Sequence, residues 1–188
     1  MFTETFVRGL DYLLALGTVL TQIASVAVLV LYFLRNRGER FSATSSLIGR
    51  YGVFLSFFLF FVSMALSLFY SEILGFKPCS LCWLQRVFMY PQVFLLWLAL
   101  YKKERAIADY SIALSIPGAL VAIYQHYLQM GGGAFLPCLA NSDLLDCSTR
   151  TFFEFGYVTY PLMAFTAFIF SIALMLHVRA GREEKDEA

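Results

Sequence analysis

Five long apolar stretches follow one another along the chain, separated by short charged or polar breaks. They cover residues 12–34, 51–71, 81–101, 106–128 and 155–178. A helix needs about 20 residues to cross a hydrocarbon core of roughly 30 Å, and each stretch has about this length. Barrel strands would instead show segments of about ten residues with alternating hydrophobicity. The pattern therefore predicts an all-α integral membrane protein with five spans.

The first stretch could also be read as a signal peptide. However, the leader 1–11 contains Glu4, Arg8 and Asp11 and lacks a basic amino-terminal region. The apolar run that follows is longer than the 7–15 residues typical of a signal peptide. We therefore expect 12–34 to remain as a membrane span.

Composition agrees with this picture and limits where chemistry can occur. Of the 188 residues, 60% are hydrophobic and only 14% are charged, whereas soluble domains carry about 25% charged residues. Such a short chain has no room for a separate soluble catalytic domain beside the bundle. The net charge of +1 also argues against nucleic acid as a partner.

Lysine and arginine alternate between the two sides of the predicted bundle. One side carries ten of them: Arg35, Arg37, Arg40, Arg50, Lys102, Lys103, Arg105, Arg179, Arg182 and Lys185. The other side carries only Arg8, Lys77 and Arg150, with Arg86 inside a span. Because positive residues concentrate in the cytoplasm, we expect the amino terminus outside and the carboxyl terminus in the cytoplasm. The alternation also favours five spans over four or six.

All four cysteines then lie on the outer face, where disulfides persist. Cys79 and Cys82 start the third stretch, and Cys138 and Cys147 lie in the last outer loop. The loop pair alone is most simply a staple. A Cys-x-x-Cys closes too small a loop to be a good staple, and a helix amino terminus stabilises a thiolate. A zinc site with four cysteine ligands is the main alternative, and spacing alone does not separate it from redox chemistry.

Arg86 favours redox chemistry. It follows Cys82 by four residues, so the two side chains share roughly one helix face. An arginine near a helix end can simply extend to the interface, but intramembrane arginines usually face a bundle interior or a ligand. A cation there would repel zinc and stabilise a thiolate or an anionic reduced cofactor.

The segments that carry these residues resemble the disulfide bond formation protein B family, DsbB and its BdbC-type relatives. They are Pro78-Cys-Ser-Leu-Cys-Trp-Leu-Gln-Arg86, Met89-Tyr-Pro91, Tyr124-Gln-His-Tyr-Leu-Gln129, Pro137-Cys138 and Asp146-Cys-Ser148. The resemblance covers about the last 140 residues. It implies a four-helix oxidase of the bacterial cell membrane that takes electrons from a secreted DsbA-like thioredoxin-fold oxidase. The electrons pass to quinone, either ubiquinone or menaquinone.

The resemblance also assigns roles to residues. It implies disulfides Cys79–Cys82 and Cys138–Cys147, with Cys82 nearest the quinone. Cys138 is the expected site of the mixed disulfide with the partner. Arg86 would lie beside the quinone ring, and His126 is a further candidate for the quinone site, although it could equally make an ordinary interfacial hydrogen bond.

Two features depart from the family pattern. The family core has four spans, so 12–34 is an extra amino-terminal transmembrane helix of unknown role. We therefore divide the chain into 1–50 with this helix, a catalytic bundle at 51–178 and a charged cytoplasmic tail at 179–188. In addition, only eight residues separate Cys138 from Cys147, as in the compact BdbC-type members.

Two other functions remain possible. A vitamin K epoxide reductase-type protein also couples a membrane Cys-x-x-Cys to quinone, but its loop pair precedes that motif, whereas here the pair follows it. A non-enzymatic membrane protein would use its cysteines as structural disulfides or zinc ligands. Bound quinone in the purified protein would support an oxidase, and stoichiometric zinc would support the metal site.

The charge alternation makes a topology prediction. After reduction, Cys79, Cys82, Cys138 and Cys147 should react with a membrane-impermeant thiol reagent in intact cells. A cysteine introduced at Lys103 should stay unlabelled until the cells are opened, and labelling of that position in intact cells would contradict the orientation.

Overall fold

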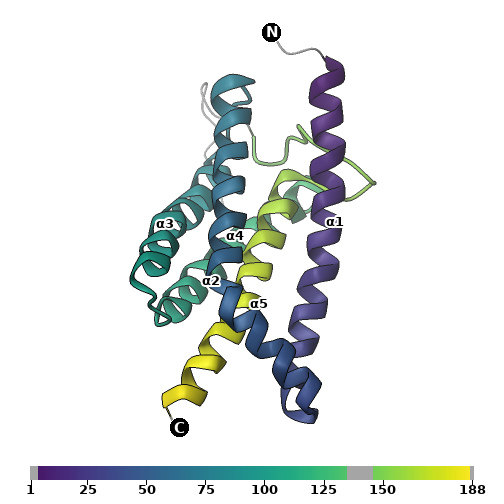
Figure 1. Ribbon diagram of the computed structural model, residues 1–188. Coiled ribbons are helices and arrows are strands. Elements are labelled where there is room, and N and C mark those ends of the chain that lie inside the picture. The colour runs from purple at the N-terminus through teal and green to yellow at the C-terminus, as the bar shows by residue number, and fades with distance from the viewer. Residues whose placement is uncertain (1–3, 135–145, 187–188) are drawn as a thin grey trace.

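The computed structural model describes residues 4–134 and 146–186 (Figure 1). This part of the chain forms five α-helices and no strand. They are α1 (Glu4–Leu34), α2 (Glu39–Leu68), α3 (Ser80–Lys102), α4 (Ile107–Gln129) and α5 (Tyr160–Asp186). A short 3-10 helix, η1 (Arg35–Arg37), joins α1 to α2, and a π-helical turn, η2 (Phe69–Ile73), extends α2.

The helices confirm an all-α, multi-pass membrane protein. Four of those in the described residues, α1, α2, α4 and α5, are long and apolar enough to cross a membrane. The third helix, α3, has 23 residues, the same length as α4. Gln85, Arg86 and Gln92 make it more polar, and it packs between α2 and α4.

The apolar stretches predicted the presence and order of the helices correctly, but they predicted the first and last residues of the helices less well. The last helix begins at Tyr160 rather than at residue 155, because Phe155 and Gly156 have positive φ values of 52° and 77°. This backbone forms a turn closed by a bridge between Glu154 and Val158. At the other extreme, α2 begins at Glu39, twelve residues before the apolar run, since a helix needs no apolar side chains where it leaves the membrane.

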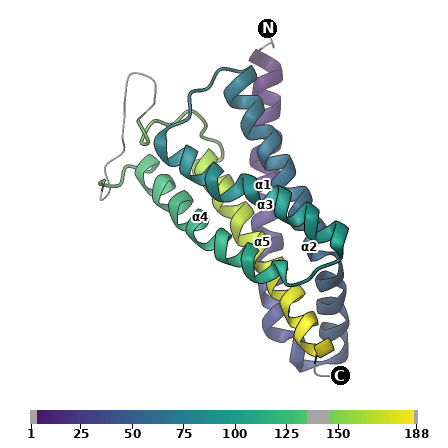
Figure 2. The same cartoon turned by 90° about the vertical axis from the view of Figure 1, so that its left-hand side faces the viewer.

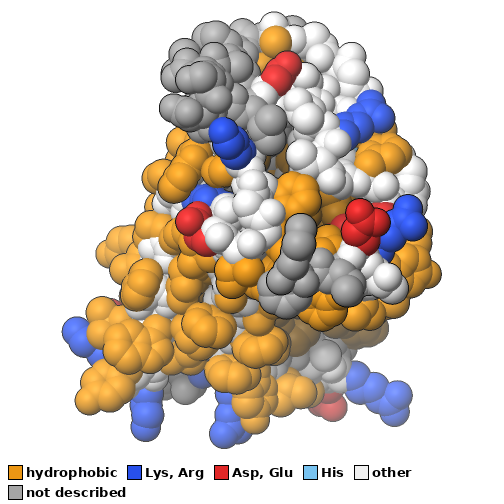
Figure 3. Space-filling model, turned by 90° about the horizontal axis from the view of Figure 1, so that it is seen from above, with side chains coloured by type: hydrophobic (Ala, Val, Ile, Leu, Met, Phe, Trp, Pro, Cys, Tyr) orange, Lys and Arg blue, Asp and Glu red, His pale blue; other side chains and the backbone are white. Residues whose placement is uncertain are grey.

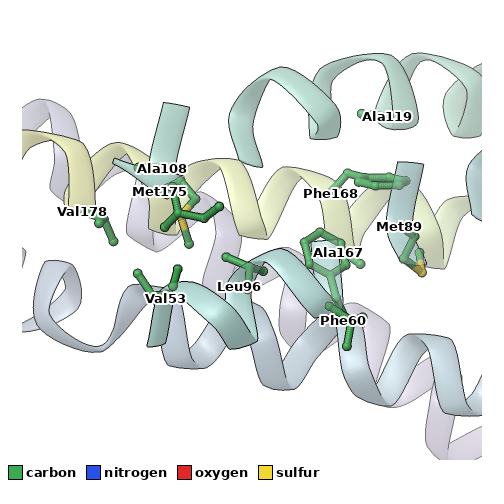
Figure 4. Close-up of a cluster of buried hydrophobic side chains, with 13 residues drawn as sticks. Val53, Phe60, Met89, Leu96, Ala108, Ala119, Ala167, Phe168, Met175 and Val178 are labelled. Atoms are coloured by element: carbon green, nitrogen blue, oxygen red, sulfur yellow. The ribbon is translucent and has the colours of Figure 1, made fainter. Parts of the chain in front are cut away.

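The core lies where α2, α3, α4 and α5 meet (Figure 4). The rings of Phe60 and Phe168 lie 5.7 Å apart, centroid to centroid. A Cβ on Gly118 would approach the Phe168 ring to 2.5 Å, and one on Gly49 would approach the His177 carbonyl oxygen to 2.8 Å. Glycine at these two positions therefore allows α4 and α2 to lie close against α5, as small residues do in membrane bundles.

Connections gather at the two ends of the bundle (Figures 1 and 2). At one end, Arg182 of α5 forms a 2.9 Å ion pair with Asp109 of α4, close to the carboxyl terminus. At the other end lie the start of α1, the segment between η2 and α3, and residues 146–159. Viewed from this second end, charged side chains are scattered among apolar ones (Figure 3).

Candidate redox site

Cys79 and Cys82 begin the third helix. Cys79 is the N-cap of α3, with extended backbone (φ −81°, ψ 173°), and its Sγ accepts a hydrogen bond from the Cys82 backbone N–H at 3.3 Å. A sulfur here takes the place of the side-chain oxygen that usually satisfies the free N–H groups of a first turn. The two Sγ atoms lie 2.9 Å apart. Both residues are free thiols, and their sulfurs are close enough to form a disulfide after a small movement.

The two sulfurs differ in their surroundings. Cys79 is buried, with 4% of its surface exposed, while Cys82 is only partly buried. The hydrogen bond with Cys82, together with burial, raises the pKa of the Cys79 thiol. Cys82 is the sulfur that borders a cavity, and it does so together with Arg86.

A side-chain amide from α4 holds the sulfur pair. Gln125 is 1% exposed, and its Nε2 donates to Cys79 Sγ at 3.0 Å and to Cys82 Sγ at 3.1 Å. Its Oε1 accepts a hydrogen bond from Gln85 Nε2 of α3. This amide pair links α3 to α4 and supplies donors to sulfur, which suits a thiolate as an acceptor.

Sequence reasoning did not assign a role to Gln85 or Gln125. The sequence did contain a clue to them, because polar residues inside an apolar stretch are expected to pair with other polar groups in the bundle. Gln85 also lies one turn after Cys82. That Gln125 is the partner depends on how α3 and α4 pack, which their separate sequences do not state.

Arg86 is held by the second helix. Its Nε donates to Ser67 Oγ at 3.0 Å and its Nη2 donates to the Ser67 carbonyl at 3.1 Å. The guanidinium also lies 5.0 Å from the centre of the Trp83 ring. Ser67 uses two of the five N–H groups of a guanidinium. Arg86 is thus fixed in the bundle wall beside Cys82.

The cavity beside Cys82 has a volume of about 370 Å³, within the range of roughly 300–1,000 Å³ typical of small-molecule sites. It lies between α1, α2, α3 and α5 and is lined mainly by apolar side chains. Cys82, Gln85 and Arg86 of α3 border it, and Ser67, the hydrogen-bond partner of Arg86, lines it as well. The arrangement suits an apolar ligand that presents an oxygen acceptor to Arg86.

His126 had two expected roles, in the quinone site or in an ordinary hydrogen bond, and the structure shows a hydrogen bond. Its Nδ1 lies 2.9 Å from Thr159 Oγ1, at the start of α5. It is absent from the described residues that line the cavity. The structure therefore brings Arg86 and Cys82 together without His126, which makes a hydrogen bond between α4 and the turn before α5.

Cys147, one of the two loop cysteines, lies next to the Cys-x-x-Cys motif. Cys147 is 1% exposed, and its Sγ lies 3.6 Å from Ser80 Oγ. It packs in one apolar cluster with Cys79 and Leu128. Gln129 holds this segment by donating from Nε2 to the Thr149 carbonyl at 3.0 Å. The predicted partner, Cys138, lies outside the described residues.

Known proteins resemble this chain over most of its length. The family model described as disulfide bond formation protein DsbB matches residues 49–178. Probable disulfide formation protein C 1 of Bacillus anthracis is 39% identical over 119 residues, 63% of this chain and 85% of the relative. In Bacillus subtilis, SPbeta prophage-derived disulfide bond formation protein B is 36% identical over 135 residues, 71% of this chain and 90% of the relative.

Disulfide bond formation protein C of Bacillus subtilis is 33% identical over 135 residues, covering 70% of this chain and 95% of the relative. No solved structure matches the chain significantly. The matched family region contains both cysteine elements and most of the bundle, and α1 precedes it.

The Gln125 hydrogen bonds predict an effect on the redox potential. Replacing Gln125 with Leu should destabilise the reduced pair, because a hydrogen bond to a charged group contributes about 1.5–3 kcal/mol. The Cys79–Cys82 potential should then fall by about 30–60 mV, measured by equilibration with dithiothreitol. As a control, Gln92→Leu removes an equally buried amide that bonds Ser111 and Ser115. Equal potentials in the two variants would contradict the assigned role.

Proposed function

Because the chain belongs to the DsbB family of disulfide bond formation proteins, we propose that it is a protein-disulfide:quinone oxidoreductase. In this proposal it reoxidises a secreted, DsbA-like thioredoxin-fold oxidase and passes the electrons to quinone. The observation that carries the proposal is the cavity bordered by both Cys82 and Arg86. It places a reactive sulfur and a fixed cation beside space for an apolar ring.

The residues of the cavity suit this chemistry. A bound quinone supplies an acceptor for the two electrons and two protons released when a dithiol becomes a disulfide. Arg86 can donate a hydrogen bond to a ring oxygen while Ser67 fixes its guanidinium. Cys82 faces the same space, and Gln125 holds its sulfur beside that of Cys79. The apolar walls exclude water and leave room for a hydrocarbon tail.

Electrons enter through the loop. A thiolate of the partner attacks Cys138 and forms a mixed disulfide, which releases Cys147 as a thiolate. The second partner thiol then resolves the mixed disulfide, so the partner leaves oxidised and the loop pair is left reduced. The loop dithiol in turn reduces the Cys79–Cys82 disulfide. Packing of Cys147 against Ser80 and Cys79 supports this second transfer.

The orientation follows from the same arrangement. The described cysteines lie at the bundle end that carries the start of α1, while most lysines and arginines belong to the opposite end. We place the cysteine end outside the cytoplasm and the carboxyl terminus inside, in a bacterial cell membrane. The DsbB match spans both cysteine elements, which favours this function over a vitamin K epoxide reductase-type activity or a structural zinc protein.

Purified protein tests the function directly. In detergent or liposomes it should oxidise a reduced thioredoxin-fold protein over many turnovers only when ubiquinone or menaquinone is added, with one quinone reduced per dithiol. Cys82→Ser should abolish quinone reduction. A protein that contains stoichiometric zinc and reduces no quinone would contradict the proposal.

The loop pair predicts a trapped intermediate. Replacing Cys147 with Ala leaves Cys138 without its neighbouring thiol, so a mixed disulfide between Cys138 and the partner should accumulate on non-reducing gels. The Cys138→Ala, Cys147→Ala double variant should trap nothing. Full partner oxidation by Cys138→Ala alone would show that electrons enter elsewhere.

The position of Arg86 beside the cavity predicts that its replacement weakens quinone binding. Arg86→Lys keeps the charge but loses the planar fork that reaches both Ser67 and a ring oxygen. Losing a charge-assisted hydrogen bond of about 1.5–3 kcal/mol should raise the KM for quinone about tenfold to a hundredfold, measured with saturating dithiol. Arg50→Lys is the control, because Arg50 also lies over a ring, that of Tyr51, but does not line the cavity. An unchanged KM in Arg86→Lys would mean that Arg86 only anchors the helix.

A further inference from the structure

The first helix forms part of the wall of the Cys82 cavity, although the family match begins only at residue 49. Its contribution comes from Leu13, Leu14, Gly17, Thr18 and Thr21. These positions recur every three to four residues and therefore share one helix face. On another face, Leu20, Ile23 and Val26 are 58–62% exposed, as expected of side chains that contact lipid.

Hydrogen bonds hold this wall at three levels along α1. Near the start of α1, Asp11 accepts a hydrogen bond from the Tyr70 hydroxyl, and Tyr70 itself lines the cavity. In the middle, Gln22 donates to Thr166 Oγ1 of α5 at 3.3 Å. Near the far end, the Val28 carbonyl lies 3.0 Å from His177 Nε2. The helix is therefore fixed against α5 and η2 along most of its length.

Gly17 leaves open space where α1 faces the cavity. A Cβ at this position would meet no heavy atom within 4 Å, and its φ lies outside the left-handed region. A larger side chain could therefore be accommodated by the backbone but would occupy room beside the ligand. Gly17, an exposed position that also lines the cavity, therefore leaves space beside the wall that a larger side chain would occupy.

We propose that α1 is a wall of the quinone site and that Gly17 determines how tightly this protein binds quinone. This inference rests on the proposed function. Cys82 and Arg86 define the end of the cavity that receives the ring, and the apolar side chains of α1 and α2 suit its hydrocarbon tail. The extra helix then contributes to the affinity of the enzyme for quinone.

A matched pair of variants tests the proposal. Gly17→Phe places a ring in the space beside the cavity wall. Gly9→Phe changes a glycine of the same helix that also has open space around it but does not line the cavity. Affinity for a short-chain ubiquinone and a short-chain menaquinone is measured by quenching of Trp83 and Trp97 fluorescence in detergent. Gly17→Phe should raise the Kd for the bound quinone at least about tenfold, and Gly9→Phe should leave it unchanged.

The outcomes separate this inference from the function on which it rests. Wild-type protein that neither binds nor reduces quinone would contradict the proposed function. Wild-type protein that does both, with equal Kd values in Gly17→Phe and Gly9→Phe, would overturn the role of α1 alone. Loss of a co-purifying phospholipid from Gly17→Phe without a change in quinone affinity would also overturn it, because the wall would then face lipid.

A second set of variants covers the possibility that Gly17→Phe does not fold. Asp11→Ala and Tyr70→Phe each remove the same hydrogen bond between α1 and η2. Both should weaken quinone binding, and the double variant should bind no more weakly than the weaker single variant. Wild-type affinity in Asp11→Ala would contradict the role of α1, and so would a double variant whose loss of affinity equals the sum of two single losses.

Discussion

The structure depends on keeping two sulfur atoms and their polar partners inside an apolar bundle. Gln125 satisfies this constraint by donating to both Cys79 and Cys82 while accepting from Gln85. An unpaired amide at this depth would cost several kcal/mol, so the three groups stabilise one another. They also fix the position of α3 relative to α4 at the end of the bundle where Cys147 packs against Cys79.

The first turn of α3 places its two cysteines in two different environments. Cys79 lies in the cluster that contains Cys147 of the loop, and Cys82 borders the cavity inside the bundle. The N-cap geometry of Cys79 brings the two sulfurs together across a single turn. In the proposed function, electrons therefore pass from the loop cysteines to the cavity without a large movement of the helices.

Close helix packing gives the cavity its boundaries. Gly49, Gly52 and Gly118 let α2 and α4 lie against α5 without intervening side chains, so the core near Phe60 and Phe168 is filled. Space remains beside α1, which packs on the bundle through apolar side chains such as Ala15 and Val19 as well as through polar contacts. The α1 helix adds a wall to a cavity otherwise lined by α2, α3, α5 and the adjoining turns.

The sequence by itself determined the class of protein and the helices, and it supplied the candidate redox residues. Long uninterrupted apolar runs are typical of helices that span lipid, and Arg86 after Cys-x-x-Cys favours redox chemistry over a zinc site. Helix ends were less certain, because hydropathy reports the lipid boundary and not the backbone turn at Phe155 and Gly156. Only the tertiary structure decided that Gln125 bonds the sulfurs, that His126 turns toward Thr159, and that α1 lines the cavity. These facts depend on distances between helices far apart in the chain, which no single segment encodes.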